Sequence, residues 1–304
     1  MATLKGQNFR VLMLNATTHK YHVIGMSTNC QITLTNNVDD SGTKDDTGLA
    51  SKPVTTSKTW QVQVDSLNVS DIGNLLSYMK GQTPLYLLWD EVSTNDNQTP
   101  VDEGQNVYGG KAYLSDVTFN FNDRENSATN LQFTGAAELE TTVSPDTEIV
   151  GAGSYTKGQF VRLFLSSDNT AAPAAVIAAC KQMSLHVSLT MEDSTTKDTA
   201  GEWQIQEPTA LNYDISTTAL VRSGDTITSA VAGKGLPEIE TIYINGTPVK
   251  WKIANTSGAN NRTASSTICS GSCLLTSLQI SAQNRSNATY QATLTGYGPY
   301  TVGS

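Results

Sequence analysis

Few side chains in this sequence combine the types and spacing that chemistry requires. The closest pair of thiols is Cys269 and Cys273, separated by three residues that include a glycine. Such a pair suits a tight loop that holds a strained disulfide or supplies half of a metal site. No second pair of Cys or His stands at the complementary spacing. We therefore expect reduced thiols, and whether these two cysteines pair stays open.

Histidines and carboxylates offer no better constellation. His19 and His22 have no carboxylate nearby in the sequence, and we interpret them as surface or edge-strand residues. Asp45-Asp46 and the pair Glu138 and Glu140 are acid-base candidates by residue type alone, because adjacent carboxylates are usually solvated. No nucleophile elbow, phosphate-binding glycine loop or His-Glu-x-x-His motif occurs. The sequence predicts no enzyme, no metal and no cofactor.

Charge and apolar patterning narrow the class of protein. The 304 residues carry a formal net charge of −9, which disfavours adhesion to DNA or anionic lipid through a basic patch. The apolar residues fall in short runs, and none approaches the roughly 20 residues that a membrane helix needs. The first run, Val11–Leu14, is too short for a signal peptide. We expect synthesis and folding in the cytoplasm, without a membrane partner.

The elements that must position any functional surface come in two copies. Three short motifs recur in the same order in the second half, at offsets of 152, 153 and 161 residues. They are Gly6-Gln7 with Arg10, repeated as Gly158-Gln159 with Arg162; Asp40–Gly48, repeated as Asp193–Gly201; and Arg124–Gly135, repeated as Arg285–Gly296. We expect one domain at residues 1–140, a linker at 141–158 and a second copy of the domain at 159–304.

Each copy has the residue pattern of β-strands. Apolar and polar residues alternate over short segments rich in Thr, Val and Ile, as in half-buried antiparallel strands. These segments are Gln31–Thr35, Trp60–Val64, Val117–Phe121 and Leu131–Gly135 in the first copy, and Leu185–Leu189, Leu211–Ile215 and Leu278–Ile280 in the second. The sequence therefore predicts a mainly β fold.

One helix is predicted in the first copy, at Asp71–Lys80. Its apolar residues follow an i, i+3, i+4, i+7 stripe, Ser70 can cap its start and Gly81 can end it. A weaker counterpart lies near Asp225–Ala232. Each copy should therefore be a β domain with one packed helix.

Two polar connections, 38–58 and 192–208, are long for hairpin loops. Loops beyond about a dozen residues are often functional or mobile. Either they are solvated surface loops, or they extend as hairpin arms that become ordered by contact with a neighbouring subunit. Their low apolar content gives them little to bury within their own domain.

An ordered series of motifs in the first copy resembles a known family. The series comprises Thr43–Gly48, Ser57–Leu67, the helix, a Gly-x-Thr-Pro at 81–84, Gly109–Leu114 and Asn126–Thr129. It resembles the major tail (tail tube) proteins of long-tailed bacteriophages. The second copy keeps Thr196–Asp198, Gly201 and Asn287–Gly296, while the Lys-x-Trp strand becomes Ala210–Asp214.

The resemblance implies two tandem copies of a β-sandwich or barrel-like tail tube domain, each with a short flanking helix and a long hairpin loop. It implies a structural virion protein whose domains form six-fold rings, stacked into a tube that conducts DNA and holds the tape-measure protein. Tail-terminator or baseplate proteins would be further partners. Because one chain carries two domains, three chains would close each ring.

The resemblance also places the polar loop residues in contacts between subunits or rings. The candidates are Asp40, Thr43, Lys44, Asp45 and Gly48 in the first copy and Asp193, Thr196, Lys197, Asp198 and Gly201 in the second.

A conduit for a polyanion should have an acidic or neutral wall with few Lys and Arg. If the last two strands of each copy line the bore, the residues opposite their apolar faces would face the lumen; otherwise they face bulk solvent. These residues are Asp116, Thr118, Asn120, Gln132, Thr134, Glu138, Glu140, Gln279, Ser281, Gln291 and Thr293.

Two other classes share parts of this pattern. An extracellular β-sandwich lectin or adhesin would have similar Ser-, Thr- and Asn-rich strands, but we expect an export signal and either an aromatic platform or a calcium cluster, and neither is visible. A carbohydrate-active enzyme would need a convergent carboxylate pair, which the sequence does not exclude.

Overall fold

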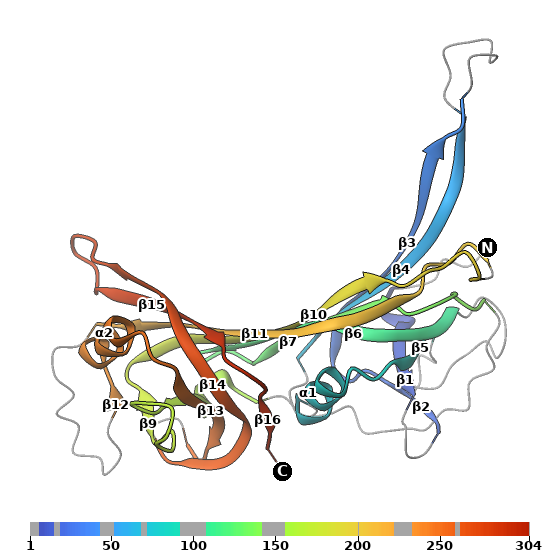
Figure 1. Ribbon diagram of the computed structural model, residues 1–304. Coiled ribbons are helices and arrows are strands. Elements are labelled where there is room, and N and C mark those ends of the chain that lie inside the picture. Colours follow the sequence, from blue (N-terminus) through green and yellow to red (C-terminus); the bar gives the residue numbers. More distant parts are fainter. Residues whose placement is uncertain are drawn as a thin grey trace.

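The computed structural model describes residues 6–14, 19–42, 52–67, 72–91, 108–141, 156–199, 201–221, 233–258 and 262–303. The described chain is mainly β, as the alternating segments predict, and contains two α-helices (Figure 1). Its strands pair into one sheet of 16 strands. None of the described helices has the length and apolar character to cross a membrane.

The elements follow one another in the same order in both halves of the chain. The N-terminal half contains a 3-10 turn η1 (Gly6–Asn8), β1 (Phe9–Leu14), β2 (Tyr21–Val23), β3 (Ser27–Asp40), β4 (Pro53–Ser66), α1 (Ile72–Gly81), β5 (Leu85–Glu91), β6 (Tyr108–Asn122) and β7 (Ala128–Gly135). The C-terminal half contains η2 (Gly158–Phe160), β8 (Val161–Leu165), β9 (Ala175–Ile177), β10 (Cys180–Asp193), β11 (Gln206–Leu220), β12 (Gly233–Lys234), α2 (Leu236–Asn245), β13 (Val249–Thr256), β14 (Ala264–Ser281), β15 (Thr289–Gly296) and β16 (Thr301–Val302).

The strands also take the same positions in the sheet. In the N-terminal half they lie in the order β2-β1-β5-β6-β7-β4-β3. In the C-terminal half the order is β9-β8-β13-β14-β15-β11-β10. The short strands β12 and β16 add to β9 and β14.

A strand pair between the halves makes the sheet continuous. Along Tyr108–Ala112, one edge of β6 pairs with β5. Further along the strand the same edge pairs with β10, where Asp116 lies opposite Ser188 and Asn122 lies opposite Gln182. We call this β6–β10 pair the internal junction. The halves are therefore joined in one open sheet.

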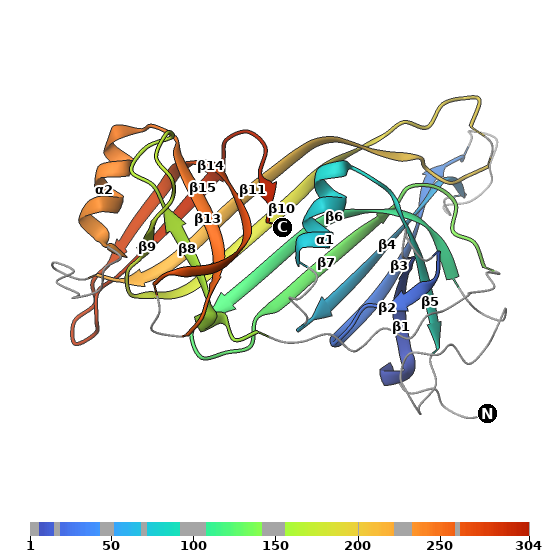
Figure 2. The same ribbon diagram turned by 90° about the horizontal axis from the view of Figure 1, so that it is seen from below.

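The main core lies on the side of the sheet where both helices pack (Figure 2). In α1 the predicted apolar stripe of Ile72, Leu75, Leu76 and Met79 is buried. The C-terminal residues of the chain contact the N-terminal half, because the Tyr300 hydroxyl donates a hydrogen bond to the Leu76 carbonyl at 2.6 Å.

The second helix begins later than the sequence analysis indicated. Asp225–Ala232 lies outside the described residues, and α2 occupies Leu236–Asn245. Pro237 stands in its first turn, and the backbone N–H of Gly235 donates to the Glu238 carboxylate at 2.9 Å. Gly246 ends the helix in the left-handed region at φ 59°. These are ordinary start and stop signals that the weak apolar periodicity concealed.

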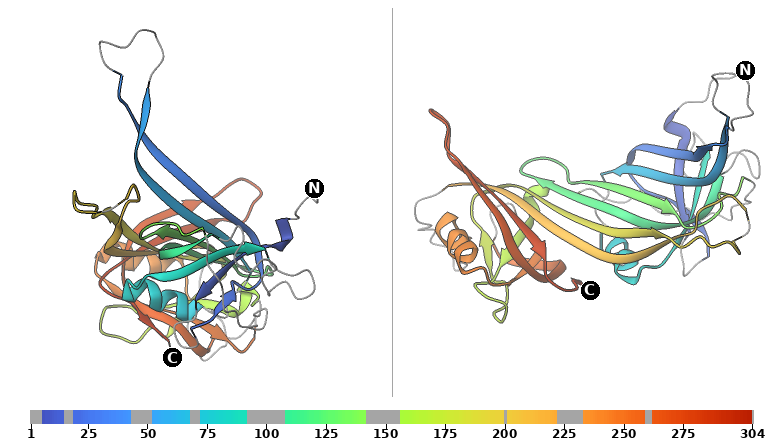
Figure 3. Two further views of the ribbon diagram at one scale, coloured as in Figure 1. Left: turned by 90° about the vertical axis from the view of Figure 1, so that its right-hand side faces the viewer. Right: turned by 45° about the horizontal axis from the view of Figure 1, so that its top comes forward.

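The two long polar connections differ from each other. In the first, the β3–β4 ladder continues to Asp40 opposite Pro53, so this hairpin projects from the body of the molecule (Figures 1 and 3). In the second, the backbone of Lys58 in β4 accepts a hydrogen bond from Gln204 at 3.0 Å and donates one to Glu202 at 2.7 Å. The β10–β11 loop therefore packs against the other half, contrary to the expectation that only other subunits order it.

Candidate functional site

The face of the sheet opposite the helices carries polar side chains. In β6, Val117 and Phe119 are buried in the core, while Asp116, Thr118 and Asn120 alternate with them and are partly exposed. Successive side chains of a strand point to opposite faces, so these three lie on the side away from the core. This side of the long central strands is not covered by either helix (Figures 1 and 2).

The ladder registers extend this surface over eight neighbouring strands, because residues directly opposite each other share a face. We call the resulting set the polar face: Asn29, Gln31, Thr33 and Thr35 of β3; Thr59, Gln61, Gln63 and Asp65 of β4; Asn130, Gln132 and Thr134 of β7; Asp116, Thr118 and Asn120 of β6; Gln182, Ser184, His186 and Ser188 of β10; Asn212, Asp214, Ser216 and Thr218 of β11; Gln291, Thr293 and Thr295 of β15; and Ser277, Gln279 and Ser281 of β14. Apart from His186, its ionisable groups are the carboxylates of Asp65, Asp116 and Asp214, and the set contains neither Lys nor Arg.

Most of the candidates for the bore wall fall on the polar face. The structure brings together Asp116, Thr118, Asn120, Gln132, Thr134, Gln279, Ser281, Gln291 and Thr293. Thr134 is buried among them, and its hydroxyl donates to Ser115 Oγ at 2.8 Å.

Glu138 and Glu140 do not join this group. β7 ends at Gly135, so the two glutamates do not continue its alternation. The backbone of Glu140 pairs with Gly109 at the start of β6, and its carboxylate accepts a hydrogen bond from Tyr86. Burial together with the charge of Glu140 raises the pKa of Tyr21 to about 12. Glu140 therefore belongs to the β1–β2–β5 corner of the sheet.

A three-residue charged cluster crosses the internal junction on the polar face. His186 of β10 contacts Asp116 of β6 through Nε2 at 2.7 Å and Asp214 of β11 through Nδ1 at 2.9 Å. Partial burial lowers the pKa of His186, but the hydrogen bonds to the two carboxylates outweigh it, and the net shift is upward. The protonated imidazole can donate to both carboxylates at once. We call these residues the histidine clamp.

Sequence analysis missed the clamp. His186 stands 70 residues from Asp116 and 28 from Asp214, so no local spacing indicates the contact. The only signal is His186 itself, a titratable residue on the polar side of the alternating segment Leu185–Leu189. The pairing of β6 with β10 supplies the rest.

The loop candidates lie at the ends of the two hairpins. Asp40 and Asp193 end β3 and β10 and cap the turns that follow, since Asp40 Oδ1 accepts the N–H groups of Gly42 at 3.0 Å and Lys52 at 3.1 Å, and Asp193 Oδ1 accepts that of Thr195 at 2.9 Å. Thr196, Lys197, Asp198 and Gly201 follow in exposed or partly exposed turns. Thr43, Lys44, Asp45, Asp46 and Gly48 lie outside the described residues.

The cysteine pair proves to be structural. Cys269 and Cys273 both lie buried in β14, opposite Ile253 and Val249. Four residues along a strand span about 13 Å, while a disulfide needs Cα atoms within about 7 Å. All four cysteines are free thiols. Among the residues that the structure describes, no cluster of His, Cys, Asp and Glu could hold a metal ion.

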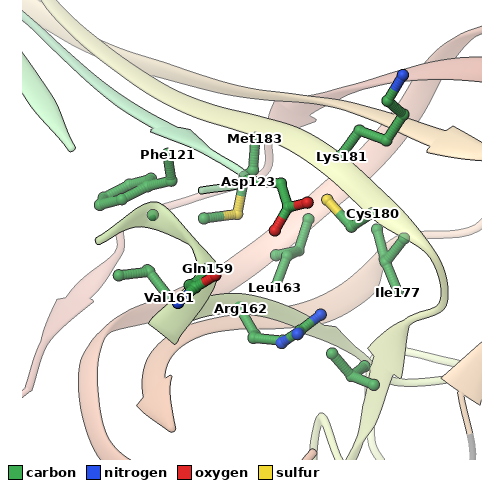
Figure 4. Close-up of a pocket in the computed structure, with 12 residues that line it drawn as sticks. Phe121, Asp123, Gln159, Val161, Arg162, Leu163, Ile177, Cys180, Lys181 and Met183 are labelled. Atoms are coloured by element: carbon green, nitrogen blue, oxygen red, sulfur yellow. The ribbon is translucent and has the colours of Figure 1, made fainter. Parts of the chain in front are cut away.

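A small pocket lies where the two halves meet, between β6, η2, β8, β9 and β10 (Figure 4). Apolar side chains such as Phe121 and Met183 line it together with Asp123, Arg162 and Lys181. Its volume of about 30 Å³ corresponds to about one water molecule. We interpret it as a packing gap of the internal junction and not as a substrate site.

Comparison with known families decides the class of the protein. Residues 157–302 match the family model described as phage tail tube protein. The C-terminal half of the chain thus matches the phage tail tube protein family. This family is structural and not enzymatic, and its members are components of the virion tail. The chain is accordingly a tail component of a bacteriophage virion.

Solved tail structures show a distant likeness to this chain. The tail of an empty gene transfer agent particle, with C6 symmetry, shares 15% identity and a TM-score of 0.36, covering 48% of this chain and 95% of its own. A native gene transfer agent virion shares 14% identity with a TM-score of 0.36, and the match covers 49% of this chain and 99% of that chain. The SPP1 tail tube shares 18% identity with a TM-score of 0.36, and the match covers 52% of this chain and 80% of that chain. None of the curated proteins matches the sequence.

Proposed function

We propose that this chain assembles into stacked rings that form the phage tail tube, and that DNA passes through the tube without specific binding. The observation that carries the proposal is the polar face, which runs unbroken across strands of both halves and contains neither Lys nor Arg. Basic side chains would neutralise phosphates and release counterions, which would make every layer of the tube a binding site. A wall of hydroxyls, amides and carboxylates lets a polyanion slide.

We further propose that the two halves arose by duplication of one tail tube domain, so that three chains supply the six domains of a ring. The same order of elements and of strands in both halves supports this proposal. In such a ring the junctions within chains alternate with junctions between chains. The tape-measure protein and a tail-terminator or baseplate protein are the further partners that a tail tube implies.

Two measurements on purified protein test these proposals. Electron micrographs should show rings and hollow tubes, and native mass spectrometry of isolated rings should give three chains. Rings of six chains would contradict the stoichiometry while leaving the tube function intact. A protein that stays monomeric under all conditions of concentration and salt would contradict the tube function itself.

A further inference from the structure

Besides the short end strands β2 and β12, two long strands have an edge without a partner within the described part of the chain. β3 pairs with β4 along one edge alone, and β14 from Leu274 to Ser281 pairs with β15 along one edge alone. The corresponding strands of the opposite halves are β10 and β6, and these two pair with each other at the internal junction. The chain thus contains one complete junction and the two separate sides of a second one.

The correspondence of these strands can be fixed residue by residue from their bulges. β3 and β10 have the same irregularity near their start, at an offset of 153 residues, and β6 and β14 have the same irregularity at an offset of 161. The bulges are Ser27/Asn29 and Cys180/Gln182 in the first comparison and Leu114/Asp116 and Leu275/Ser277 in the second.

Apolar residues that are covered at the internal junction are uncovered at the unpaired edges. Val187 of β10 and Phe119 of β6 are 0% exposed, whereas Leu34 and Ile280, which occupy the corresponding positions, are 54% and 49% exposed. Large apolar side chains at this exposure on unpaired strand edges are typical of surfaces that are covered in an assembly.

A pair of glycines gives a second, independent indication. In η2, a Cβ on Gly158 would come within 3.0 Å of the backbone of Phe121 and Asn122, so the end of β6 packs directly on this glycine. In η1, the corresponding residue is Gly6, and a Cβ there would meet nothing within 4 Å. The space beside Gly6 matches the place that the end of β6 takes beside Gly158.

We propose that β3 of one chain pairs antiparallel with β14 of a second copy of this chain, in the register of the internal junction. Transfer of that register places Leu34 opposite Leu278, Thr33 opposite Gln279 and Ile32 opposite Ile280. The backbone of Gln283, just after β14, then lies against Gly6. This inference rests on the proposed assembly and specifies its interface.

The partner strand must come from another molecule. β3 and β14 lie at opposite ends of the sheet, as Figure 1 shows, so a chain does not pair its own two edges. The contact joins different surfaces of the two copies, and such heterologous contacts close into rings when the rotation per subunit allows it. The polar face then continues from Thr33 of one chain to Gln279 of the next.

Disulfide trapping in assembled tubes tests the register. Directly opposed residues have Cα atoms about 4.5–5.5 Å apart, within reach of a disulfide. The double variant Thr33→Cys/Gln279→Cys should therefore give covalent dimers and trimers on a non-reducing gel after mild oxidation. The control Asn29→Cys/Gln279→Cys uses another exposed β3 residue four positions away, about 13 Å from its partner, and should remain at the background of the single variants.

The outcomes separate the interface from the tube function. Tubes that form while the Thr33/Gln279 pair stays uncross-linked, or while the Asn29/Gln279 pair links equally well, overturn the register and leave the tube function standing. Absence of both tubes and cross-links overturns both the interface and the tube function.

A second test uses Gly6. The Gly6→Val variant should leave a folded monomer with the thermal stability of the wild type but abolish assembly, whereas Gly258→Val, where a Cβ also meets nothing within 4 Å, should assemble. Normal tubes from Gly6→Val overturn the proposed contact.

Discussion

At the scale of residues, each half of the sheet is held by an aromatic ring that lies directly on glycines. Trp60 of β4 covers Gly135 and donates its indole N–H to the Ala137 carbonyl at 2.8 Å. In the C-terminal half Tyr213 of β11 takes the position of Trp60 and covers Gly296. The C-terminal half therefore lacks the Lys-x-Trp motif but keeps the contact between an aromatic ring and a glycine of the neighbouring strand.

We expect Gly135→Ala to lower the free energy of unfolding by about 1–3 kcal/mol, because its Cβ would overlap the buried Trp60 ring. Chemical denaturation measures the loss. Gly258→Ala, whose Cβ meets nothing within 4 Å, is the matched control and should change stability little. Equal effects of the two substitutions would contradict the packing argument.

The histidine clamp should make stability depend on pH. The folded-state pKa of His186 lies above its ordinary value of 6.5, so the stabilisation is fully present below pH 6.5 and fades as pH rises through the raised value. His186→Gln should therefore cost about 0.5–1 kcal/mol at pH 6, after allowance for solvent exposure, and less at pH 9. Thermal melts of both proteins across this range measure it. A difference that is the same at every pH would argue against a charged clamp.

At the scale of elements, the β10–β11 loop is held in place by the other half of the chain. Trp203 packs at the edge of the core, and the Lys58 ammonium pairs with the Glu202 carboxylate at 2.6 Å. Its counterpart, the β3–β4 hairpin, extends outward instead. The two corresponding hairpins therefore lie in different surroundings.

Removal of the Trp203 side chain should loosen this loop. We expect Trp203→Ala to raise the rate of tryptic cleavage at Lys197 about tenfold, which corresponds to about 1.4 kcal/mol less protection against local opening. Time courses of limited proteolysis, resolved by mass, provide the measurement. Unchanged cleavage in the variant would mean that Lys197 is accessible without opening of the loop.

Local patterns predicted the elements that local physics determines. The helix stripe from Ile72 to Met79 and the alternation of Val117–Phe121 both follow from neighbours in sequence. The internal junction does not, because the β6–β10 pair joins residues between 60 and 72 positions apart and depends on tertiary packing. The glutamates 138 and 140 were assigned by extending an alternation past Gly135, where the strand has already ended.

At the scale of the whole molecule, the sign of charge on the polar face should decide whether a tube holds DNA. The exposed residues Gln63, Gln132 and Gln291 lie on three different strands of this face. We expect the triple Lys variant of these residues to assemble tubes that retain added DNA at low salt and release it as salt rises. Wild-type tubes should retain none.

A matched control places the same charges on the other side of the sheet. Asn74, Ser77 and Thr241 are exposed on α1 and α2, and their Lys variants should assemble into tubes that let DNA through as the wild type does. The measurement is filter retention of labelled DNA at several salt concentrations. The DNA is added before assembly, because the variants can be distinguished only when the DNA lies inside the bore. Retention by the control and not by the polar-face variant would reverse our assignment of the inner wall.

The internal junction has a consequence for how fast a tube can start. A covalent connection holds β6 and β10 at an effective concentration far above that of separate subunits, in the millimolar range for short tethers. In the proposed ring, half of the junctions therefore exist before any two chains meet. Closure then takes three chains instead of six separate domains, which makes nucleation a lower-order reaction in subunit concentration and favours early rings while the protein is still scarce.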